Sequence, residues 1–80
     1  MKNIHSIEKR VIDLINTIIE THESEISLES TIEDTPAWDS LAHLQIVSGI
    51  EGWIGRQLNF DEIIGITCVQ DCIKIVSANV

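Results

Sequence analysis

The chain has 80 residues, enough for one small domain with a modest core. Hydrophobic residues make up 44% of it, which excludes a disordered chain, and the net charge of −8 argues against binding to nucleic acid or anionic lipid. No Lys or Arg lies between Val11 and Gly55, whereas the same span is rich in Asp and Glu. We therefore expect a single domain over residues 1–80 that is attracted to basic faces of other proteins.

The two cysteines, Cys68 and Cys72, have neither the spacing nor the second pair that a zinc site needs. Two thiols without a disulfide framework favour a reducing compartment. The N-terminal residues lack the pattern of a signal peptide, and no segment is apolar for the length of a membrane span. The sequence predicts a soluble, cytoplasmic and monomeric protein without a bound metal.

Apolar residues at steps of three and four predict a first helix from about residue 4 to about residue 20. They are Ile4, Ile7, Val11, Leu14, Ile15 and Ile18. The stretch 21–39 is polar and acidic, and we expect a long loop whose isolated residues Ile26, Leu28 and Ile32 attach it to the core. A loop of this length in a small domain is often functional.

A second helix is predicted to begin at Asp39 or Ser40, either of which can cap its first turn. Gly55 is suited to end it. The spacing of its apolar residues predicts a buried face made of Leu41, Leu44, Val47, Ile50 and Ile54.

A short helix over Phe60–Ile64, opened by Asn59 or Asp61, comes next in the prediction. Thr67 is then expected to cap the last helix. Its predicted inner face is Val69, Cys72, Ile73 and Val76. The expected fold is all-α: a small four-helix bundle with three main helices, one short helix and a long loop between the first and the second.

Residues 36–47 read PAWDSLAHLQIV and place a serine where the second helix begins. Ser40 can be a helix cap, which requires no further function. It can be a nucleophile with His43 and Asp39, but the acid then adjoins the serine, and no glycine-rich turn supplies an oxyanion hole. It can also be an exposed handle for a prosthetic arm, because the start of a helix stabilises a phosphodiester.

The run WDSLAHLQIV resembles the attachment motif of acyl carrier proteins, in which D-S-L marks the serine that carries phosphopantetheine. Members of that family have similar length, low pI and a long loop before the motif. They often have an acidic residue eleven positions after the serine and a hydrophobic one three later, here Glu51 and Ile54. The stretch 66–76, ITCVQDCIKIV, is similar to the family's last helix and follows Ser40 without a gap.

The resemblance implies that a phosphopantetheinyl transferase attaches the arm to Ser40 and that the arm's thiol holds an acyl or aminoacyl group. The carrier itself catalyses nothing. Its partners are the transferase, an acyl- or aminoacyl-loading enzyme and a downstream synthase or transferase, none of them a nucleic acid or a membrane. These enzymes recognise the second helix and the loop before it, and we expect His43 to face solvent beside Asp39. The residues expected to contact partners are Trp38, Asp39, Leu41, His43, Gln45 and Glu51.

The second helix departs from that of fatty-acid carriers, because Ala42, Gln45 and Gly52 are neutral where those carriers are acidic. This run looks more like stand-alone carriers of specialised pathways, such as polyketide assembly, hybrid peptide assembly or small-acid loading. A housekeeping fatty-acid carrier is the second choice. An aliphatic bundle can open to admit an alkyl chain, whereas a short or polar cargo stays outside. From another class, the rival is an unmodified acidic helical adaptor for a basic protein, in which Ser40 is only a helix cap.

Overall fold

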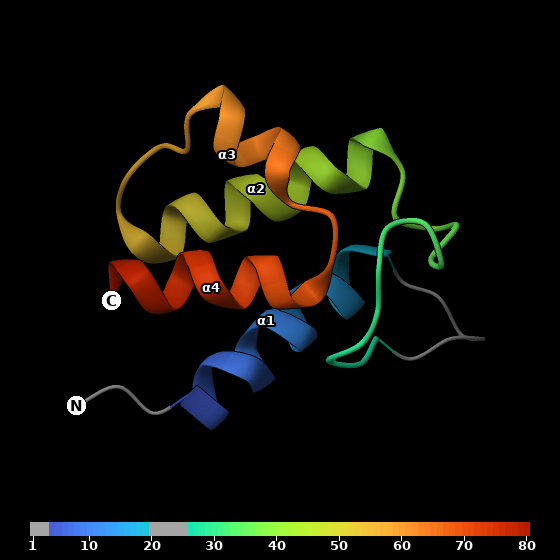
Figure 1. The fold of residues 1–80 in the computed structure, drawn as a ribbon, viewed down its shortest axis with the longest axis horizontal. Helices are drawn as coiled ribbons and strands as arrows, with labels where there is room; N and C mark the ends of the chain where they lie inside the picture. The colour runs from blue at the N-terminus through green and yellow to red at the C-terminus, as the bar shows by residue number, and fades with distance from the viewer. Residues whose placement is uncertain (1–3, 20–25) are drawn as a thin grey trace.

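Four helices account for most of residues 4–19 and 26–80, the part of the chain that the computed structural model describes (Figure 1). They are α1 (Ile4–Ile19), α2 (Ser40–Ile54), the short α3 (Phe60–Gly65) and α4 (Val69–Asn79). Within those ranges there is no named strand, only one isolated bridge between Thr31 and Cys68. The predicted all-α fold is confirmed. Part of the predicted loop and the last residue of the predicted first helix fall in 20–25, outside the described residues.

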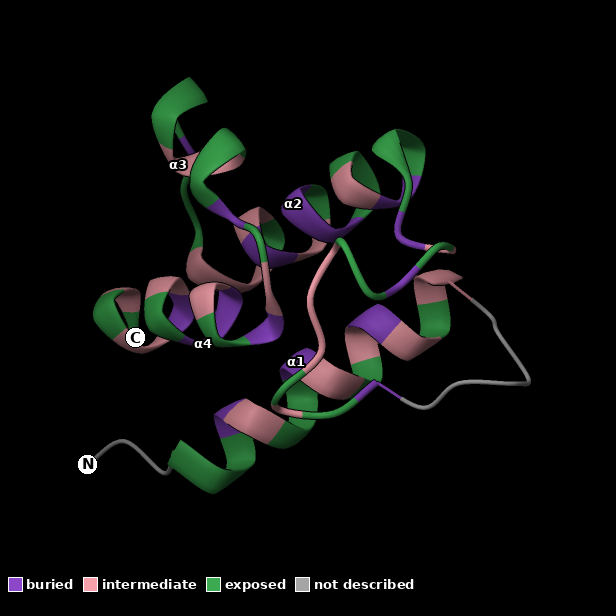
Figure 2. Ribbon diagram, turned by 45° about the vertical axis from the view of Figure 1, so that its right-hand side comes forward, coloured by how far each residue is buried: buried purple, intermediate pink, exposed green. Residues whose placement is uncertain are grey.

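The core lies where α1, α2 and α4 meet, and their buried residues face one another (Figure 2). Ile7, Val11 and Ile15 form the buried stripe of α1. The inner face of α4 is the predicted one, formed by Val69, Cys72, Ile73 and Val76. All of these side chains are aliphatic or a thiol, so the facing sides of α1 and α4 contain no large ring.

The predicted buried face of α2 is partly wrong. Leu41 and Leu44 are exposed, at 66% and 59%, and Ile54 is only half-buried. The face that packs on the core consists of Ala42, Ile46, Val47 and Ile50. Because α2 is apolar around much of its circumference, its periodicity is compatible with two stripes, and only the packing of α1 and α4 selects one.

The ends of α2 and α3 follow the predicted local signals. Asp39 is the N-cap of α2, and Gly55 ends that helix with a left-handed φ of 77°, a conformation that favours glycine. Asn59 caps α3 in a reciprocal capping box with Glu62.

The start of α4 differs from the prediction, because the N-cap is Cys68 and its side chain makes no capping bond. Thr67 instead donates from its N–H and its hydroxyl to one oxygen of Asp71, each at 2.9 Å. Both bonds lower the pKa of Asp71, and the bond from the backbone N–H of Thr67 has the larger effect. The N–H of Val69 donates to the carbonyl of Ser30 at 3.0 Å, so the long loop supplies the acceptor that a capping side chain would have provided.

The described part of the long loop is attached to the core as expected. Ile26 is buried, and its N–H donates to Asn16 Oδ1 of α1 at 3.2 Å. Leu28 and Ile32 pack against the core while remaining partly exposed. The N–H of Ile32 also donates to the carbonyl of Thr67 at 2.9 Å. The loop therefore reaches the start of α2 from a fixed position between α1 and the α3–α4 connection.

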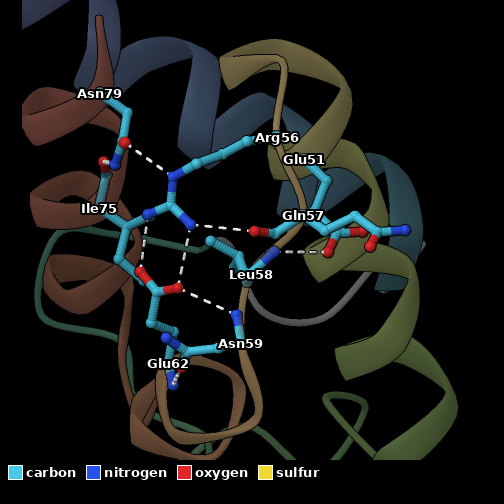
Figure 3. A network of polar contacts seen from close by, with 8 residues as sticks. All are labelled: Glu51, Arg56, Gln57, Leu58, Asn59, Glu62, Ile75 and Asn79. Atoms are coloured by element: carbon cyan, nitrogen blue, oxygen red, sulfur yellow. Dashed lines mark hydrogen bonds and ion pairs between the residues drawn. The ribbon is translucent and has the colours of Figure 1, made fainter.

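A polar network holds the segment between α2 and α3 (Figure 3). Arg56 donates to both carboxylate oxygens of Glu62, at 3.0 and 2.8 Å, and to Asn79 Oδ1 of α4 at 2.9 Å. The bond from Arg56 lowers the pKa of Glu62 to about 2. Glu51 Oε2 accepts from the N–H of Leu58 at 2.8 Å. These bonds matter because no residue of α3 is fully buried, so polar contacts have a large share in positioning that helix.

Two further contacts join α1 to α2. The guanidinium of Arg10 lies 4.0 Å from the ring centre of the half-buried Trp53. Leu14 lies against Gly49, where an added Cβ would come 2.8 Å from a leucine methyl. Across residues 4–19 and 26–80, every helix is too short or too polar to traverse a lipid bilayer.

Candidate functional site

Ser40 is the first residue of α2 and is exposed. The cap belongs to its neighbour: Asp39 has an extended backbone, and its Oδ1 accepts from the N–H of Ala42 at 2.9 Å. Of the two predicted caps the structure therefore selects Asp39. The hydroxyl of Ser40 is not used to start the helix, and it sits at the positive end of the helix dipole.

A cavity of about 520 Å³ opens beside this serine. Its lining comes from the long loop and the first turns of α2, namely Ile32, Trp38, Asp39, Ser40, His43 and Leu44. We call it the serine cavity. The lining surface is mainly apolar and includes a few polar groups, the usual character of a site for an organic ligand.

A second cavity of about 660 Å³ lies between the long loop and α3, and we call it the α3 cavity. It is lined by Thr31, Ile32, Glu33, Asp34, His43, Ile64, Ile66 and Thr67. Ile32 and His43 belong to both linings. The two cavities are thus neighbours that share one wall.

His43 forms that wall, and both of its ring nitrogens have partners. Trp38 Nε1–H donates to His43 Nδ1 at 3.0 Å, and His43 Nε2 lies 2.9 Å from the carbonyl oxygen of Ile63. An indole N–H can only donate and a carbonyl can only accept, so the neutral ring with its proton on Nε2 satisfies both contacts. The two rings also stack, with centroids 6.2 Å apart.

This arrangement corrects the expectation for His43. It is half-buried rather than facing solvent, and its side chain contacts Trp38 rather than Asp39, to which only its backbone N–H donates. Local helix spacing suggested Asp39, but a buried indole N–H requires an acceptor, and the imidazole provides one.

The chemistry of the site is that of a free hydroxyl and not of an activated one. Both nitrogens of His43 are directed at groups other than Ser40, and the carboxylate of Asp39 caps α2. The other candidate nucleophile is the thiol of Cys72, which is buried in the core, and burial raises its pKa to about 12. It is therefore a poor nucleophile.

The other predicted partner-contacting residues differ in their accessibility. Leu41 and Gln45 are exposed on α2. Trp38 is only 3% exposed, so a partner could reach it only where its ring lines the serine cavity. The carboxylate of Glu51 is engaged by the N–H of Leu58. Ala42, one of the neutral residues that distinguish this helix from the acidic helix of fatty-acid carriers, is buried. Its lack of charge therefore does not alter the exposed surface of α2.

Three residues of the site were not predicted as site residues. Leu44 was expected on the buried face of α2, yet it is exposed and lines the serine cavity. Ile32 was expected only to attach the loop, yet it lines both cavities. Ile63 contributes a backbone carbonyl from α3, which no side-chain pattern can indicate. The sequence offers one signal for the interior of this site: a loop tryptophan, Trp38, is followed five residues later by His43 in the first turns of the next helix.

Comparison with known proteins adds no family to this description. No family model matches the chain, and a search of curated proteins found no match either. A function for this chain therefore has to rest on its own residues and on the geometry of the serine cavity.

Proposed function

We propose that the chain is an acyl or aminoacyl carrier protein that bears a phosphopantetheine arm on Ser40. The observation that carries the proposal is that two neighbouring residues at the start of α2, Asp39 and Ser40, have different roles. Asp39 caps the helix, which leaves the hydroxyl of the exposed Ser40 in the lining of a mainly apolar cavity. The resemblance of the run WDSLAHLQIV to the carrier attachment motif supports phosphopantetheine as the group that this hydroxyl would bear.

A transferase would form a phosphodiester between the serine oxygen and the arm donated by coenzyme A. The negative phosphodiester would lie beside the backbone N–H groups of the first turn, which favour an anion. The thiol at the end of the arm would hold the cargo as a thioester, ready for transfer in a partner enzyme. The chain contributes attachment and presentation, and the reactions belong to its partners.

Partner enzymes would dock on the outer surface of α2. Leu41 and Leu44 are large exposed apolar side chains within one turn of Ser40, and Asp39 adds a negative charge beside them. Such a surface suits a partner with an apolar patch and a basic rim. The neutral Gln45 and Gly52 on the exposed side of α2 favour a specialised pathway over housekeeping fatty-acid synthesis.

The proposal is tested by intact mass before and after incubation with coenzyme A and a broad-specificity phosphopantetheinyl transferase. We expect a gain of one phosphopantetheine in the native protein and none in Ser40→Ala. A folded native protein that gains no mass with several transferases would contradict the proposal. The exposed Leu41 and Leu44 would then be the binding surface of an unmodified acidic adaptor.

A further inference from the structure

The α3 cavity is a groove that is open to solvent, and its lining combines two kinds of side chain. Ile32, Ile64 and Ile66 supply apolar surface, and the side chain of Ile64 is 58% exposed. Glu33 and Asp34, both exposed, supply two carboxylates from the long loop. A small ligand is normally buried over most of its surface in its site, so an open groove suits one segment of a larger partner better.

The two carboxylates have no cation beside them in the part of the chain that the structure describes. No ion pair there involves Glu33 or Asp34, and the sequence has no Lys or Arg between Val11 and Gly55. Asp34 Oδ2 accepts from the hydroxyl of Thr31 at 3.0 Å, a neutral partner that leaves the negative charge uncompensated. A basic side chain from another protein is therefore the complement of this charge.

The apolar surface of the groove extends from Ile64 to the start of α3. Phe60 is 73% exposed and lies four positions before Ile64, so the two side chains share one face of this helix. Large apolar side chains that are exposed together mark surfaces that another protein covers. This face belongs to α3 and is separate from the exposed Leu41 and Leu44 of α2.

Both elements that form the groove are held in place before a partner binds. The N–H of Ile32 donates to the carbonyl of Thr67 at 2.9 Å, which attaches the loop to the α3–α4 connection. The contact of His43 Nε2 with the carbonyl of Ile63, at 2.9 Å, joins the later part of α3 to α2. A partner thus meets a site that is already formed, which lowers the cost of ordering it on binding.

We propose that the α3 cavity is a docking groove for a segment of a partner protein in which an apolar side chain is flanked by Lys or Arg. The apolar side chain contacts the isoleucines of the groove, and the cation pairs with Glu33 or Asp34. Because Ile32 and His43 line both cavities, the bound segment lies beside Ser40. The inference rests on the proposed function only for the identity of the partner, an enzyme that acts on the carried group.

The test selects short random peptides, displayed on phage, against the Ser40→Ala protein, which cannot bear an arm. We expect the enriched peptides to contain an apolar residue flanked by Lys or Arg. A synthetic copy should shift the amide resonances of Ile64 and Thr67 in the ¹⁵N-labelled protein. Enrichment of no basic peptide, or shifts confined to Leu41 and Leu44 on α2, would overturn the inference.

Variants of the groove show whether both of its parts contribute to binding. Glu33→Gln combined with Asp34→Asn should raise the Kd of the peptide about fivefold at low salt, through loss of exposed ion pairs. Ile64→Ser should raise it about tenfold, through loss of apolar contact. The matched control is Glu29→Gln combined with Asp61→Asn, which removes two exposed acids outside both cavity linings and should raise the Kd less than about twofold. Equal effects of the two double variants would mean attraction by net charge alone and would overturn the inference.

This experiment separates the docking groove from the carrier function. The replaced side chains are exposed, so each variant should keep the helical circular dichroism of the native protein. Failure of the arm to attach to the native protein contradicts the proposed function and leaves the peptide results unchanged, because they are obtained with Ser40→Ala. An arm that attaches to Ser40, together with a peptide that is insensitive to the groove variants, overturns the docking groove alone.

Discussion

Replacing Ser40 by alanine should leave the stability of the fold nearly unchanged, whereas replacing Asp39 should not. Asp39 Oδ1 accepts from the N–H of Ala42 at 2.9 Å, and loss of such a cap costs about 1 kcal/mol. Its charge at the start of α2 adds about 0.3–1 kcal/mol. Asp39→Ala should therefore lower the free energy of unfolding by about 1–2 kcal/mol. Ser40→Ala should stay within about 0.5 kcal/mol of the native value, since alanine is a good residue in a helix.

Urea unfolding followed by circular dichroism measures this difference. With an m-value near the lower end for small proteins, about 1 kcal/mol/M, Asp39→Ala should move the midpoint down by about 1–2 M. Asp39→Asn is the matched control, because asparagine keeps an acceptor oxygen and loses only the charge. If Ser40→Ala lowers the midpoint as much as Asp39→Ala does, Ser40 is itself a cap, and loss of function in that variant no longer reports on attachment.

Three other expectations concern two glycines of α2, stability in acid and thiol reactivity. Gly52→Ala should stabilise α2 by about 0.5–1 kcal/mol, because the added Cβ meets nothing within 4 Å. Gly49→Ala should be less stable than Gly52→Ala in thermal melts, because its Cβ would come 2.8 Å from a methyl of Leu14 in α1, which has to shift. The hydrogen bond from Arg56 lowers the pKa of Glu62 from 4.5 to about 2, so its contribution is present above pH 4.5 and is lost as the pH falls toward 2. Urea midpoints between pH 6 and 3 should fall less steeply in Glu62→Gln, and an identical slope would contradict the pairing. Cys72 should resist iodoacetamide at pH 8 in the folded protein and react in urea, as read by mass; equal rates would mean that the core is open.

Much of the fold could be predicted because its signals are local. The stripe of α1, the inner face of α4, and the glycine that ends α2 follow from residues a few positions apart. The capping of α3 by Asn59 is local as well. In each case the residues that carry the signal lie on the same helix or directly beside it.

The errors arose where a partner distant in sequence decides the outcome. The exposed side of α2 is as apolar as the buried one near Leu41 and Leu44, so only packing against other helices distinguishes them. In the first turn of α4, the N–H of Val69 donates to the backbone carbonyl of Ser30, which lies far back in the chain. The candidate site follows the same rule. Its motif points to Ser40, but the contact of His43 with a backbone carbonyl twenty residues away could not be predicted from the sequence.

Ion pairs between helical residues also affect where the net charge of the molecule resides. Lys9 is paired with Asp13 and Arg56 with Glu62, while Arg10 covers Trp53 near the last turn of α2. Among residues 4–19 and 26–80, no ion pair involves the acids that line the two cavities, Glu33, Asp34 and Asp39. These three acids thus place unpaired negative charge beside the two cavities near Ser40. A basic enzyme would be drawn to this side of the molecule over a distance that salt shortens, so added salt should slow association more than it speeds dissociation.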